Sequence, residues 1–141
     1  METLRRPLAV IVGLTAVAVL FHFVLGPVYE DVVESHDVWN VLNWFMALGV
    51  IVALVVTFLA KREAEAGDCD TNTYIRVNVK FYTAAVLPIL FFWNWVNELV
   101  GGGGSEGDVN GNYWALINTL YVILMAWVSL HLWSHAHRDQ Q

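Results

Sequence analysis

Long uncharged apolar runs dominate the chain, and the stretches between them hold most of its charged residues. A helix rises 1.5 Å per residue, so it needs about 20 apolar residues to cross the roughly 30 Å hydrocarbon core of a bilayer. Four runs reach or approach this length. None shows the ten-residue alternation of a membrane β-barrel strand. The pattern predicts transmembrane helices over residues 7–29, 38–62, 75–100 and 113–134.

These four predicted helices define the fold class. A helix satisfies its own backbone hydrogen bonds, which lipid requires of any isolated span. Short connections favour antiparallel neighbours. The first run could also be a signal peptide, because twin arginines precede it and Ala16-Val17-Ala18 imitates a cleavage site. The apolar run continues well past Ala18, so we interpret it as a retained helix. We therefore expect an all-α integral membrane four-helix bundle, with residues 1–141 forming one domain.

The basic residues indicate the orientation of the predicted helices. All seven fall in the N-terminus, in the loop between the second and third helices, or near the C-terminus; they are Arg5, Arg6, Lys61, Arg62, Arg76, Lys80 and Arg138. The loops around 28–37 and 100–112 contain no Lys or Arg. Cytoplasmic segments carry an excess of Lys and Arg. The sequence thus predicts a multi-pass protein of the cell membrane with both termini in the cytoplasm.

Composition narrows the class of partner. The chain is 57% hydrophobic and only 14% charged, whereas a soluble domain is about a quarter charged. Its net charge is −6. A negative chain without a basic block argues against nucleic acid as a partner. Cys69 is the single cysteine, so no disulfide can form within the chain.

Polar residues gather toward the predicted outer membrane face. The pattern Trp-Asn-x-x-Asn occurs at residues 39–43 and again at 93–97. One interpretation is an aromatic belt with Asn side chains bonding between helices, each worth about 0.6 kcal/mol. The other is a buried polar site that contacts a ligand, a lipid or a subunit, because polar groups in a membrane are costly. Its candidate residues are His22, Asn40, Asn43, Asn94, Asn97, Glu98 and Asn118.

A second candidate site lies at the predicted cytoplasmic end of the fourth helix. His131 and His135 are four residues apart and share a helix face, and His137 follows. Two His ligands hold a metal only with further ligands. A polar interfacial tail is the alternative interpretation. His22 lies deep within a predicted span and no second His lies at its depth, so the sequence does not provide paired haem ligands. We predict no cofactor, and a metal only at this His group.

The sequence contains no complete catalytic motif, so we do not expect an enzyme acting alone. It is typical of a small non-catalytic accessory or structural subunit of a larger membrane enzyme complex, such as an oxidase or a monooxygenase. Its expected partners are membrane lipids and other membrane subunits. A small oligomeric transporter or channel is an alternative, although transporters usually carry mid-membrane charges that this chain lacks. A metal-handling membrane protein is the third interpretation.

Overall fold

The computed structural model describes residues 2–29, 35–67, 69–100 and 109–138, and this part of the chain is all-α. Its four helices are α1 (Glu2–Tyr29), α2 (Ser35–Ala66), α3 (Thr71–Leu99) and α4 (Val109–Arg138). Each contains a stretch long and apolar enough to cross a membrane. The prediction of an all-α chain with four such helices is confirmed. Four such helices indicate a multi-pass membrane protein.

Every helix begins a few residues before its predicted start, and α2 and α4 also end later. Hydropathy marks where the apolar run stops, whereas a helix stops where its backbone hydrogen bonds stop. The polar end of α2 is rich in good helix formers, and Lys61 Nζ lies 3.6 Å from Glu65 Oε1 one turn later. Asp70 then adopts an extended backbone conformation immediately before α3.

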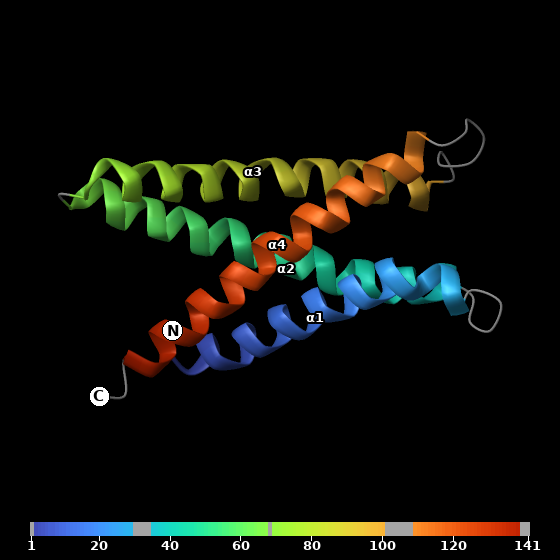
Figure 1. The fold of residues 1–141 in the computed structure, drawn as a ribbon, viewed down its shortest axis with the longest axis horizontal. Coiled ribbons are helices and arrows are strands. Elements are labelled where there is room, and N and C mark those ends of the chain that lie inside the picture. Colours follow the sequence, from blue (N-terminus) through green and yellow to red (C-terminus); the bar gives the residue numbers. More distant parts are fainter. Residues whose placement is uncertain (1, 30–34, 68, 101–108, 139–141) are drawn as a thin grey trace.

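The helices form two pairs (Figure 1). α1 packs most extensively against α4, and α2 against α3, and between the pairs α4 contacts both α3 and α2 while α1 contacts α2. α1 and α3 finish at one end of the bundle, where α2 and α4 begin. We call this the acidic end, because residues 28–37 and 100–112 contain six acidic and no basic residues. The opposite, basic end holds both ends of the chain and the α2–α3 connection.

Two glycines lie where α4 approaches another helix closely. They are Gly13 on α1 and Gly49 on α2. The Ser129 hydroxyl of α4 donates a 2.8 Å hydrogen bond to the Ala9 carbonyl of α1, and a Cβ at Gly13 would lie 2.7 Å from that hydroxyl. Deeper in the bundle, the Tyr121 ring of α4 lies against Gly49 of α2. Tyr121 is fully buried, so this contact joins α4 to α2 at the centre of the core.

We expect Gly49→Ala to loosen the contact between α2 and α4. The new Cβ would overlap the Tyr121 hydroxyl and lie 3.2 Å from two ring carbons, and overpacking of this kind costs about 1–3 kcal/mol. Adding Tyr121→Phe should restore part of the loss, because it removes the closest atom. Thermal unfolding in detergent, followed by circular dichroism, measures both effects.

Gly26→Ala is the matched control, since a Cβ at Gly26 meets nothing within 4 Å. A Gly49→Ala variant as stable as Gly26→Ala would contradict this account of the core.

Candidate functional site

The acidic end of the bundle contains a cavity of about 210 Å³ to which all four helices contribute. We call it the acidic-end cavity. It is several times larger than the roughly 30 Å³ that one water molecule occupies in the liquid. It is smaller than the sites of about 300–1,000 Å³ that enclose drug-sized ligands. Its lining residues are Phe23 of α1, Trp39 and Asn43 of α2, Glu98 of α3, and Trp114, Ala115 and Asn118 of α4.

Two amide side chains line this cavity from opposite helix pairs. Asn43 and Asn118 each expose only 2% of their surface. The Oδ1 atom of each is buried and accepts no hydrogen bond from the residues that the structure describes. A buried acceptor without a partner costs about 1–3 kcal/mol. Two such acceptors on one cavity are typical of a site that a hydrogen-bond donor completes.

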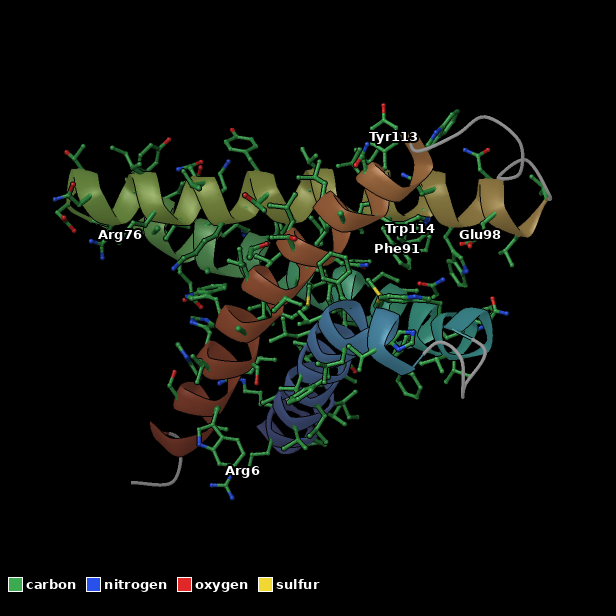
Figure 2. The ribbon with its side chains drawn as sticks, turned by 45° about the vertical axis from the view of Figure 1, so that its right-hand side comes forward. Arg6, Arg76, Phe91, Glu98, Tyr113 and Trp114 are labelled. Carbon is green, nitrogen blue, oxygen red and sulfur yellow. The ribbon has the colours of Figure 1, made fainter. Side chains whose placement is uncertain are left out.

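The aromatic walls of the cavity are held by a second layer of rings. His22 is buried and packs on Trp39, with ring centroids 4.7 Å apart. Phe91 is fully buried and meets Trp114 edge to face, with centroids 6.1 Å apart and planes at 82°. Figure 2 shows Phe91 and Trp114 close together where α3 and α4 meet. These contacts fix the indoles, so His22 and Phe91 position the walls without lining the cavity.

Glu98 supplies the only charged group in the lining. It lies in the last turn of α3, at the same end as Trp114 and far from Arg6 and Arg76 (Figure 2). Among the described residues it forms no ion pair. The adjacent connections contain no Lys or Arg. The cavity therefore carries an unneutralised negative charge at its edge.

The structure divides the polar residues that the sequence grouped together. Asn43, Glu98 and Asn118 line the cavity, and His22 lies behind Trp39. Asn94 is buried but donates to the Leu90 carbonyl of its own helix at 2.8 Å. Two residues lie elsewhere. Asn40 is exposed on α2 and does not line the cavity. Asn97 lines a separate hollow on the outer face of α3, beside Trp93.

A signal in the sequence could have identified the cavity residues. The spacing Trp-x-x-x-Asn occurs at 39–43, 93–97 and 114–118. Residues four apart share a helix face, so each copy places an indole beside an amide. The copies on α2 and α4 line the cavity, and the copy on α3 faces outward. The sequence analysis gave an aromatic belt as one interpretation of the tryptophans near this end, and it did not identify Trp114, Phe23 or Ala115 as lining residues.

The histidines at the basic end form an aromatic ladder on α4. His131 stacks on Trp127 with centroids 4.8 Å apart, and His135 follows at 4.2 Å. Lys80 Nζ of α3 lies 4.1 Å above the Trp127 ring. The Nδ1 atom of His135 lies 2.9 Å from the His131 carbonyl oxygen, to which it donates.

A metal at this ladder would need more ligands than the described residues provide. The described part of the chain contains no group of three His, Cys, Asp or Glu side chains close enough to share an ion. The His137 side chain, the third member of the predicted set, lies outside the described residues. The hydrogen bond from His135 also occupies one of its two ring nitrogens. The metal site predicted at His131, His135 and His137 therefore stays a prediction.

Comparison with protein-family models, curated protein sequences and solved structures finds no match for this chain. The site is interpreted from its own residues. It combines two buried amides, aromatic faces and one carboxylate, which is the mixture of apolar walls and a few polar groups that ligand pockets have.

We expect the double variant Asn43→Leu/Asn118→Leu to stabilise the ligand-free protein. Replacing a buried acceptor that lacks a partner recovers its desolvation cost, about 1–3 kcal/mol at each site. The measurement is thermal unfolding after exhaustive removal of lipid in detergent.

Asn94→Leu is the comparison, because Asn94 already bonds to its own helix and should change stability little. If the amides instead held helices together, the double variant would be less stable than the parent.

Proposed function

We propose that the four helices cross the cell membrane with both termini in the cytoplasm. The support is the distribution of charge. The chain segments at the basic end carry all seven Lys and Arg residues, and those at the acidic end carry none. Figure 2 shows Arg6 and Arg76 at the basic end. Under the positive-inside rule, the acidic-end cavity then lies in the outer leaflet.

The single cysteine tests this orientation directly. Cys69 lies in the α2–α3 connection, so a membrane-impermeant maleimide should label it only after intact cells are permeabilised. Cys69→Ala/Ser105→Cys moves the only thiol to the connection at the acidic end and should be labelled without permeabilisation. The reverse pattern would place the cavity on the cytoplasmic side.

The function that the site supports best is non-catalytic retention of one amphiphilic molecule by its polar head. The observation that carries it is the pair of buried Oδ1 atoms, on Asn43 and Asn118, that lack partners at the cavity. The volume of about 210 Å³ suits a head group. An apolar tail would lie outside the cavity, along helices whose outward faces are apolar. Leu20, Phe21 and Val24 of α1 are among those exposed side chains.

A second candidate function is that of an accessory subunit in a larger membrane enzyme complex, and α3 favours it. In the most apolar 18-residue stretch of α3 only 17% is buried, whereas the corresponding share in the other helices is 33–39%. The outward Trp-x-x-x-Asn copy places Asn97 beside the highly exposed Trp93. An amide facing lipid is costly, so a protein neighbour would stabilise this face.

Native mass spectrometry of the protein, extracted gently from its own membrane, tests both functions. We expect one amphiphile retained per chain, and about tenfold less retained by Asn43→Leu/Asn118→Leu, which loses two hydrogen bonds of about 0.7 kcal/mol each. Asn40→Leu, on the same helix but outside the cavity, should retain it. A larger protein in fixed stoichiometry would support the subunit function.

Retention unchanged in the double variant would contradict binding in the cavity. A chain that carries neither an amphiphile nor a protein partner would overturn both proposals.

A further inference from the structure

We infer that the ligand of the acidic-end cavity is a primary ammonium group carried on an apolar chain. This inference rests on the function proposed above and deepens it by naming the head group. It follows from three properties of the lining: the kind of hydrogen bond that it lacks, the sign of its charge, and the aromatic character of its walls.

On the residues that line the cavity, the fully buried polar atoms without a hydrogen-bond partner are of one kind. The two buried side-chain atoms without partners at the lining are both acceptor oxygens, the Oδ1 atoms of Asn43 and Asn118. Glu98 adds carboxylate oxygens, which also accept. A ligand that donates hydrogen bonds would satisfy both buried oxygens. A primary ammonium group has three N–H donors and no acceptor, whereas a phosphate or carboxylate head would bring further acceptors.

The charge of the acidic end selects a cation. Glu98 has no ion-pair partner among the described residues, and residues 28–37 and 100–112 contain six acidic residues but no Lys or Arg. A surface of one sign raises the local concentration of the opposite ion. A neutral hydroxyl head group would satisfy the amides but would leave the Glu98 carboxylate without a counter-charge. Only a cationic donor meets both requirements.

The walls suit an ammonium group as well. Trp39, Trp114 and Phe23 present three aromatic rings to the cavity, and a cation near the face of a ring, Trp best of all, is attracted by the quadrupole of the ring. A trimethylammonium group would share the charge and the aromatic attraction, but it has no N–H to give to the amides. A comparison of the primary with the trimethylated ammonium therefore measures the contribution of the hydrogen bonds separately from that of the charge.

The test is a head-group series offered to the full chain in dodecyl maltoside and read by native mass spectrometry. The probes are phosphatidylethanolamine, phosphatidylcholine and phosphatidylglycerol with identical acyl chains, together with dodecylamine and dodecyltrimethylammonium. We expect each primary ammonium probe to be retained about tenfold more than its trimethyl counterpart, since two hydrogen bonds of about 0.7 kcal/mol each amount to a factor of ten. Retention of dodecylamine would show that the ammonium suffices. Retention of phosphatidylethanolamine alone would identify a phospholipid as the source.

Variants separate the two contributions. Asn43→Leu/Asn118→Leu should abolish the preference for primary over trimethyl ammonium while both still bind. Glu98→Gln should weaken both by a similar factor, because they share the charge. Glu63→Gln removes an acidic residue at the basic end of the bundle, away from the cavity, and should leave the series unchanged. The comparison of the probes on the unchanged chain is valid even if a variant fails to fold.

The outcomes distinguish the two proposals. Equal retention of primary and trimethyl ammonium, or a preference for phosphatidylglycerol, would overturn the ammonium inference and leave amphiphile retention standing. If no probe is retained and nothing accompanies the chain from its own membrane, amphiphile retention itself fails, and the ammonium inference with it.

Discussion

The close approach of α2 and α4 is the contact on which the rest of the structure depends. The helices form two pairs, and Tyr121 of α4 reaches across from one pair to lie on the backbone of Gly49 in the other. A Cβ at position 49 would overlap the Tyr121 hydroxyl and crowd its ring. Asn43 lies six residues before Gly49 on α2, and Asn118 lies three residues before Tyr121 on α4. This contact between the pairs thus also sets the spacing of the two amides toward the acidic end.

The sequence predicts the helices and the polarity of the bundle ends well, because both depend on one-dimensional quantities. Run length fixes which segments are long enough to cross a bilayer, and the positions of seven basic residues sort the connections into two classes. Helix ends are predicted less well. Residues 63–66 are too polar for a span, yet they continue α2 because their backbone and the Lys61–Glu65 pair favour helix.

The candidate site is harder to predict, because it depends on how each helix is rotated about its own axis. Asn43 and Asn97 look alike in sequence, since each ends a Trp-Asn-x-x-Asn pattern near a helix end. Asn43 faces α4 and the cavity, whereas Asn97 faces outward. Hydropathy reports how deep a residue lies in the membrane but not which neighbour it faces. That is decided by contacts between distant residues, such as Trp114 with Phe91.

The lengths of the helices have a consequence for how the protein sits in a membrane. α2 has 32 residues, which corresponds to about 48 Å at 1.5 Å per residue, against a hydrocarbon core of about 30 Å. Upright, such a helix would extend beyond the core by roughly three turns. Tilting reduces this excess but does not remove it, because the polar segment from Lys61 to Ala66 has no place in lipid. If the helices cross a membrane as proposed, the α2–α3 end of the hairpin extends beyond the bilayer as continuous helix rather than as a short loop at its surface.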